Sequence, residues 1–199
     1  MQQKVLKQAI LAANFTAIAI IWDFLTKLIP FSSMPFGGSF IGLSMLPIVL
    51  IGLFFGPLHA ALAAFTYGLV TYLIDGYGFW NPYAVILDYG LGFMAYAAAA
   101  FFKDGMQSKY RFVLAVLVAS SLRLVFSTIS GALFYADLAT VSSNDTTLAI
   151  FNFLGGSALF YSLAYNLMYI TTTTILTIYI GLAIFNRLKL LYHSFVDNN

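Results

Sequence analysis

Three ionisable side chains fall inside long apolar stretches of the sequence: Asp23, Asp88 and Arg123. A charged group at membrane depth is costly, so each is a candidate for function unless it is paired. Asp23 lies four residues before Lys27, the order that favours an ion pair across one helical turn. We therefore interpret Asp23 as structural and treat Asp88 and Arg123 as the candidates for chemistry.

Asp88 shares one face of its predicted helix with Gly92 and Tyr96, and Tyr89 follows it in the chain. It lies about six residues into that helix, roughly 9 Å from the end at 1.5 Å per residue. A carboxylate beside small and aromatic residues suits a cationic or hydrogen-bonding ligand. These residues therefore indicate a binding site that is reached from one side of the membrane.

Arg123 shares a helix face with Ser120, Ser127 and Ser130 at spacings of three and four residues. That face must point into the protein because lipid cannot satisfy its polar groups. Two interpretations stay open. Arg123 is either a structural brace that pairs with Asp88 or with backbone carbonyls, or a group that contacts a ligand.

A further polar cluster lies in the last long apolar stretch, where Tyr161 is followed by a stripe of Ser162, Asn166 and Tyr169. Buried amides and phenols need partners, which are either other helices or a ligand. Some of the tyrosines belong to the interfacial aromatic belt and need no ligand. A ring-shaped ligand held between tyrosines, with Asp88 and Asn166 at its edge, would be the partner of the buried amide and of the tyrosines that do not belong to the belt.

The composition identifies the elements that position these residues. Soluble domains carry roughly 25% charged residues, whereas this chain has 8% charged and 61% hydrophobic residues and a mean hydropathy of +0.91. We therefore predict an all-α integral membrane protein in a lipid bilayer. The net charge of +2 is too small for a nucleic-acid partner.

A bilayer core about 30 Å thick requires about 20 helical residues. The apolar runs predict a six-transmembrane-helix bundle that forms a single membrane domain over residues 1–199, with a kink at Pro47 in the second helix. The helices are expected near residues 8–28, 39–56, 57–75, 82–102, 112–136 and 157–186.

Lysine and arginine gather on one side of this bundle, which the positive-inside rule assigns to the cytoplasm. That side holds Lys4, Lys7, Lys103, Lys109, Arg111, Arg187 and Lys189, and the opposite side holds only Lys27. We therefore expect both the N- and C-termini to be cytoplasmic. The longest connections, near residues 29–38 and 137–156, then lie outside, where long loops often bind ligands.

The sequence gives little support for a catalytic function. There is no cysteine, and neither His59 nor His193 lies near the polar clusters. Ser157 follows two glycines, as the serine of an intramembrane protease could, but no histidine lies on a helix beside it to take its proton. We expect no catalytic residue, no metal site and no cofactor, and hence a binding protein rather than an enzyme.

Small residues recur every four positions on the first predicted helix, at Ala9, Ala13 and Ala17. Such a stripe lets another helix approach closely. The spacing alone fits a neighbouring subunit and packing within the same bundle equally well.

Together these residues resemble the S component of an energy-coupling factor (ECF) vitamin transporter, and within that group most closely the thiamine-specific S component. The resemblance covers nearly the whole chain. It is carried by the alanine stripe, the segments Gly42–Ile48 and Tyr161–Asn166, and the pairs Asp88–Tyr89 and Ser130–Gly131.

The resemblance implies an outward-facing protein of the plasma membrane that captures thiamine or a related heterocyclic vitamin. Such a protein has no ATPase of its own. It works with a transmembrane coupling subunit and two cytosolic ATPase subunits, which supply the ATP hydrolysis. In that family the first-helix stripe, here Ala9, Ala13 and Ala17, meets the coupling subunit.

The family's acid followed by tyrosine matches Asp88 and Tyr89, and its tyrosine and asparagine on the sixth helix match Tyr161 and Asn166. The resemblance implies that Asp88 supplies negative charge, that Tyr89 stacks on the ligand, and that Tyr161 and Asn166 hydrogen-bond to it.

Other family positions are changed in this chain. Tyr67 and Tyr135 stand where the family has tryptophan, and Ser127 stands where it has histidine. Tyrosine attracts a cationic ring less strongly than tryptophan, so the resemblance implies a pocket for thiamine or for a related vitamin, with Tyr67 and Tyr135 as further stacking residues and Ser127 as a further binding residue. Arg123 stays a binding candidate from its own place in the fifth apolar run.

An alternative function remains at this point: a small dimeric secondary transporter or channel in which Asp88 and Arg123 relay protons or ions. Such a protein needs no partner, so co-purification with a coupling subunit and ATPases discriminates between the two hypotheses.

Overall fold

The computed structural model describes residues 2–32, 34, 38–75, 82–102, 104–135, 149, 151–153 and 155–197, with the side chains of residues 135, 196 and 197 outside that description. Five helices in this part of the chain are long and apolar enough to cross a membrane. They contain 19 to 26 residues, which is roughly 28 to 39 Å against a bilayer core of about 30 Å. The prediction of an all-helical membrane protein is thereby confirmed.

The first and third of the expected helices are α1, Gln2–Lys27, and α3, Pro57–Asp75. The fourth is a composite of α4, Pro82–Ala84, η2, Val85–Gly92, and η3, Ala95–Phe101. The fifth is α5, Lys109–Ser130, continued by η4, Gly131–Tyr135. The last long helix is α8, Ala158–Ala183, and it is followed by α9, Phe185–Tyr192, and η5, His193–Asp197.

The second apolar run forms a shorter helix than its length indicates. Helix α2 spans Met45–Phe55, 11 residues or roughly 17 Å, so the expected start near residue 39 is wrong. The preceding segment packs against α8 instead: the Thr173 hydroxyl donates to the Ser39 carbonyl at 3.3 Å, and a Cβ on Gly42 would lie 2.4 Å from Thr173. All residues of α2 are buried, so this helix is surrounded by protein.

Proline and glycine determine where α2 begins and ends. Pro47 lies in its first turn, where helix N–H groups have no partner within the helix. A proline there breaks no hydrogen bond, so the helix begins near Pro47 and is not kinked at it as expected. Gly56 ends α2 with a φ of +91°, which glycine adopts without steric cost. Pro57 then opens α3, the position that proline favours in a helix.

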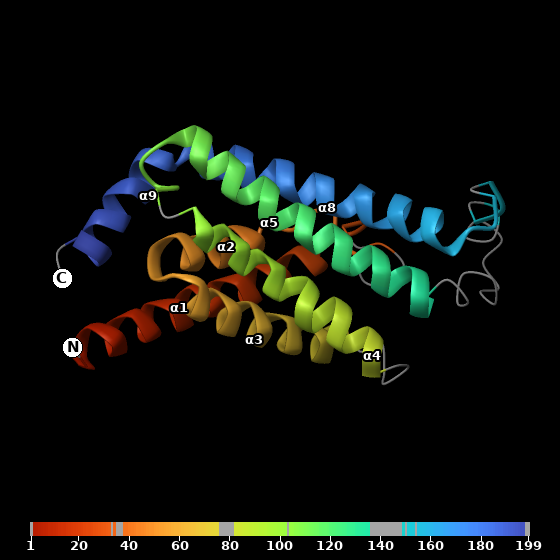
Figure 1. Ribbon diagram of the computed structural model, residues 1–199, viewed down its shortest axis with the longest axis horizontal. Coiled ribbons are helices and arrows are strands. Elements are labelled where there is room, and N and C mark those ends of the chain that lie inside the picture. Colours follow the sequence, from red (N-terminus) through yellow and green to blue (C-terminus); the bar gives the residue numbers. More distant parts are fainter. Residues whose placement is uncertain are drawn as a thin grey trace.

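Helices α1 and α3 lie along one side of the elongated bundle, α5 and α8 along the other, and α2 between them (Figure 1). The N-terminal end of α1 and the helix α9 lie at the same end of the bundle. Residues such as Ile48, Val49 and Ile51 of α2 fill the core, each with at most 1% of its surface exposed.

The fourth helix departs from regular α-helical geometry where the candidate acid stands. Residues Val85–Gly92 form a π-helix and Ala95–Phe101 a 3₁₀-helix. A π-helical turn is wide, and such turns are frequent at functional sites. It lets consecutive residues Asp88 and Tyr89 both line the interior of the bundle.

Candidate functional site

A cavity between the helices carries charged groups from four of them. It contains about 950 Å³ of space, part of which is open solvent. Its charged lining residues are Asp23 and Lys27 of α1, Asp75 of α3, Asp88 of η2 and Arg123 of α5. Its aromatic lining residues are Tyr67, Tyr89, Phe93, Tyr96, Tyr161, Tyr165 and Tyr169.

The predicted binding residues with described side chains all line this cavity. They are Tyr67, Asp88, Tyr89, Arg123, Ser127, Tyr161 and Asn166, from α3, η2, α5 and α8. Tyr135 belongs to η4, but its side chain lies outside the described residues. Of the two long connections expected from the sequence, residues 33 and 35–37 of the one near 29–38 and most of the one near 137–156 also lie outside the described residues.

Asp88 is held in place by the neighbouring helix, because the Ser127 hydroxyl donates to Asp88 Oδ1 at 2.6 Å. Arg123 lies on the same face of α5, one turn earlier. The structure forms no ion pair between Arg123 and Asp88, both of which it describes. The direct pairing considered from the sequence is therefore wrong, and Ser127 is the group that fixes the carboxylate.

Arg123 instead lies against aromatic rings. Its guanidinium carbon is 3.7 Å from the ring centre of Phe93 and 5.6 Å from that of Tyr96, which is cation–π geometry. Only 7% of its surface is exposed, and its Nη1 atom has no hydrogen-bond partner. A buried donor without a partner is rare in proteins, and Arg123 is one of the residues that line the cavity.

Asn166 joins α8 to α5. Its amide nitrogen donates to the carbonyls of Ser162, at 2.8 Å, and Ser127, at 3.2 Å. Its Oδ1 accepts from the Tyr169 hydroxyl at 2.8 Å. The partners that the sequence required for this buried amide are thus largely supplied by the protein, and one acceptor position on Oδ1 is left for a ligand.

Tyrosines form a row along α8 on the cavity side. The rings of Tyr161 and Tyr165 are stacked with their centres 6.4 Å apart, and Tyr169 meets Tyr165 edge-on at 5.8 Å. The Gly38 N–H donates to the Tyr165 hydroxyl at 3.2 Å, so the segment that precedes α2 packs against this row. These rings give the cavity an aromatic wall.

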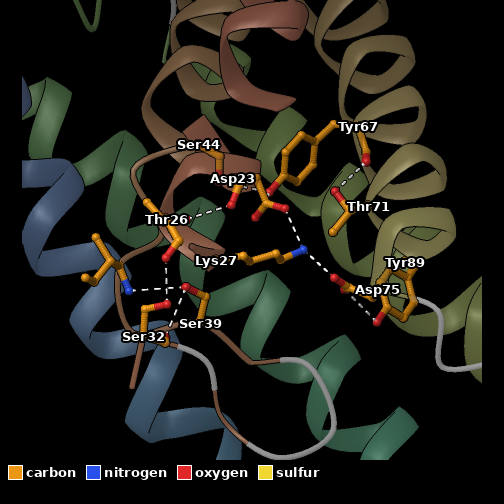
Figure 2. A network of polar contacts seen from close by, with 11 residues as sticks. Asp23, Thr26, Lys27, Ser32, Ser39, Ser44, Tyr67, Thr71, Asp75 and Tyr89 are labelled. Atoms are coloured by element: carbon orange, nitrogen blue, oxygen red, sulfur yellow. Dashed lines mark hydrogen bonds and ion pairs between the residues drawn. The ribbon is translucent and has the colours of Figure 1, made fainter. Parts of the chain in front are cut away.

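The opposite wall carries an acidic cluster that the sequence analysis did not assemble, and Figure 2 shows it. Lys27 Nζ pairs with Asp23 Oδ2 at 2.6 Å, which confirms the expected ion pair within α1. The same nitrogen also pairs with Asp75 at the end of α3. We call Asp23, Lys27 and Asp75 the Asp–Lys–Asp cluster. The signal available in the sequence was that Lys27 and Asp75 both end helices expected at the same membrane surface.

Two of the lining tyrosines are anchored to this cluster. The Tyr67 hydroxyl donates to Asp23 Oδ1 at 2.9 Å and lies 2.9 Å from the Ser44 hydroxyl. The Tyr89 hydroxyl donates to Asp75 Oδ2 at 3.3 Å. The hydroxyl groups of the rings expected to stack on a ligand therefore have protein partners, so these rings are fixed in orientation (Figure 2).

Comparisons with known proteins agree on one family and one fold. The family model described as thiamine transporter protein (Thia_YuaJ) matches residues 9–192. The thiamine transporter ThiT of Bacillus subtilis (strain 168) is 30% identical over 185 residues, which cover 88% of each protein. The solved structure of ThiT from Listeria monocytogenes has a TM-score of 0.75 and 21% identity, and covers 95% of this chain and 98% of that one. At this identity the structural likeness shows the fold alone.

Proposed function

The chain belongs to the thiamine transporter protein family, and from that premise we propose that it captures thiamine, or a close heterocyclic relative, as the S component of an ECF-type importer. It is a multi-pass protein of the plasma membrane with a role in transport. Our proposal concerns three further points: the binding of the vitamin, the residues that bind it and the partner subunits.

The observation that carries this proposal is the convergence of the predicted binding residues on one aromatic, charged cavity. Thiamine joins an aminopyrimidine ring to a thiazolium ring with one positive charge. The cavity offers tyrosine rings, which attract flat cationic groups, and three carboxylates against two basic groups. With all five ionised, the cavity has one surplus negative charge, which complements a singly charged cation.

The binding roles are assigned by position in the cavity. Asp88, held by Ser127, presents a carboxylate to the ligand. Tyr89 and Tyr67 contact its rings, and we assign the same role to Tyr135 from its place in the family pattern.

The remaining binding residues hydrogen-bond to the ligand. Tyr161 and Asn166 do so from α8, and the unpartnered N–H of Arg123 donates to an acceptor atom of the ligand.

The proposed topology is one membrane domain over residues 1–199 with six crossings and both termini in the cytoplasm. Five long helices alone would leave the chain ends on opposite sides of the membrane. The N-terminal end of α1 and the helix α9 lie at the same end of the bundle (Figure 1), which supports α2 as the sixth crossing. Its short length is acceptable because protein rather than lipid surrounds it.

The proposed surface for the coupling subunit is the stripe of Ala9, Ala13 and Ala17. All three are exposed on α1, whereas Ala12 and Ala19 face the bundle interior. Their small side chains let a partner helix approach closely. The coupling subunit brings two cytosolic ATPase subunits, which hydrolyse ATP on behalf of the complex.

Isothermal titration calorimetry of the purified protein with thiamine tests the proposal. We expect saturable binding that Asp88→Asn and Asn166→Ala each weaken about tenfold or more, because the first replaces a charged acceptor oxygen by an NH2 donor and the second removes the amide group. Asp104→Asn is the matched control, since this carboxylate pairs with Arg111 at the surface.

Uptake by reconstituted vesicles tests the partners. Uptake that requires the coupling subunit and ATP supports the S-component assignment. Uptake by this chain alone would instead establish the secondary transporter, and unchanged thiamine affinity in both cavity variants would refute the assigned site.

A further inference from the structure

The Asp–Lys–Asp cluster carries surplus negative charge in a protected part of the cavity. Lys27 is shared by two carboxylates, Asp23 from α1 and Asp75 from α3. The three side chains are 19%, 9% and 5% exposed, in the order Lys27, Asp23 and Asp75. Two ionised carboxylates and one ammonium group leave one negative charge, which solvent screens only weakly at this burial.

The wall that holds Asp88 has no such surplus. Ser127, which binds Asp88 at 2.6 Å, lies one helical turn after Arg123 on α5, so the carboxylate and the guanidinium line the same region. One carboxylate and one guanidinium group give this wall no net charge. What remains there is the unpartnered Nη1 of Arg123, which suits a neutral acceptor atom rather than a cation.

Aromatic rings connect the acidic cluster to the ligand space. Tyr67 donates to Asp23 and Tyr89 donates to Asp75, so both rings lie next to the cluster (Figure 2), and both line the cavity. A cationic ring against these tyrosines would have an aromatic face beside it and the surplus charge behind it. The two attractions act in the same direction.

We propose that the Asp–Lys–Asp cluster, rather than Asp88, is the element that selects a positively charged ligand. This inference rests on the proposed function and specifies how that site distinguishes a cation from a neutral molecule of the same shape. Lys27 pairs with both carboxylates, which would otherwise repel each other. Asp88 acts as a hydrogen-bond acceptor whose charge Arg123 balances.

The test compares two ligands in each variant: thiamine, and its uncharged analogue in which a carbon atom replaces the thiazolium nitrogen. The quantity measured is the charge preference, defined as the affinity for thiamine divided by the affinity for the analogue. Because both ligands bind the same variant, general damage to the fold largely cancels in this ratio. We expect the wild-type protein to prefer thiamine.

Asp75→Asn removes the surplus charge, and we expect it to lower the charge preference about tenfold. The double variant Lys27→Gln/Asp75→Asn leaves Asp23 as the lone charge of the cluster, so the preference should return toward the wild-type value. That recovery separates an effect of charge from an effect of disrupted packing.

A second pair of changes keeps the test decisive if Asp75→Asn does not fold. Asp88→Asn/Arg123→Gln removes one charge of each sign from the other wall. We expect weaker binding of both ligands with an unchanged charge preference. The inference is overturned if this double variant abolishes the preference, or if Asp75→Asn leaves it at the wild-type value.

The same measurements distinguish a failure of the proposed function from a failure of this inference. A wild-type protein that binds neither thiamine nor its analogue refutes the vitamin site, and the inference falls with it. A wild-type protein that binds both with equal affinity keeps the site and refutes the charge selection alone.

Discussion

Gly68 allows α3 and the π-helix η2 to cross closely, and Gly68→Ala tests the fold directly behind the site. A Cβ at this position would lie 2.0 Å from the backbone oxygen of Tyr89 and 2.9 Å from the Phe93 ring. Ordinary van der Waals contact begins at 3.4 Å. Because the nearer atom belongs to the backbone and cannot rotate away, the two helices must separate by about 1.4 Å.

Overpacking of this kind costs about 1–3 kcal/mol, which corresponds to a decrease of about 3–10 °C in melting temperature for a chain of this size. The separation also moves Asp88 and Tyr89, which follow the backbone of η2. The hydrogen bond from Tyr89 to Asp75, already 3.3 Å long, would break. We therefore expect thiamine affinity to fall about tenfold, the equivalent of about 1.4 kcal/mol.

Thermal unfolding in detergent and calorimetric titration with thiamine measure the two effects. Gly90→Ala is the matched control, since it makes the same change within η2 where the nearest atom to a new Cβ is 3.9 Å away. If Gly68→Ala melts and binds like Gly90→Ala, the close crossing of α3 and η2 is refuted.

Three other changes probe separate parts of the structure. Tyr67→Phe removes a hydroxyl that donates to a buried carboxylate, so thermal unfolding should show a loss of about 1.5–3 kcal/mol; a melting temperature equal to that of the wild type would contradict this bond. Ser127→Ala releases Asp88 and should weaken thiamine binding about tenfold in a titration, whereas full affinity would show that the carboxylate needs no anchor. Ala13→Leu on the exposed face of α1 should abolish uptake in vesicles that contain the coupling subunit while thiamine binding persists; Val125→Leu, on the exposed face of α5, is the control that should leave both intact.

Much of the bundle could be predicted from the sequence, because lipid requires long apolar helices and leaves few alternatives. Five of the expected crossings correspond to helices that are long enough to span a bilayer. The ion pair between Asp23 and Lys27 also followed from the sequence, since a spacing of four residues is a local property of one helix.

The features that sequence reasoning missed depend on contacts between helices. The length of α2 was overestimated because the residues on either side of its true start are equally apolar or neutral. The second partner of Lys27, Asp75, lies 48 positions further along the chain, and no local spacing indicates that α1 and α3 meet there. Asp88 accepts a hydrogen bond from a serine hydroxyl and forms no ion pair with Arg123, and this too depends on how α5 and η2 face each other.

The π-helical stretch Val85–Gly92 makes the site sensitive to the number of residues as well as to their identity. Deleting one apolar residue ahead of Asp88 would let the segment relax toward a regular α-helix and change the direction in which the carboxylate leaves the helix axis. Asp88 would then no longer point toward Ser127 and the ligand space. Such a deletion variant still contains every binding side chain. It would lose the binding geometry only because the residues of this helix face in other directions.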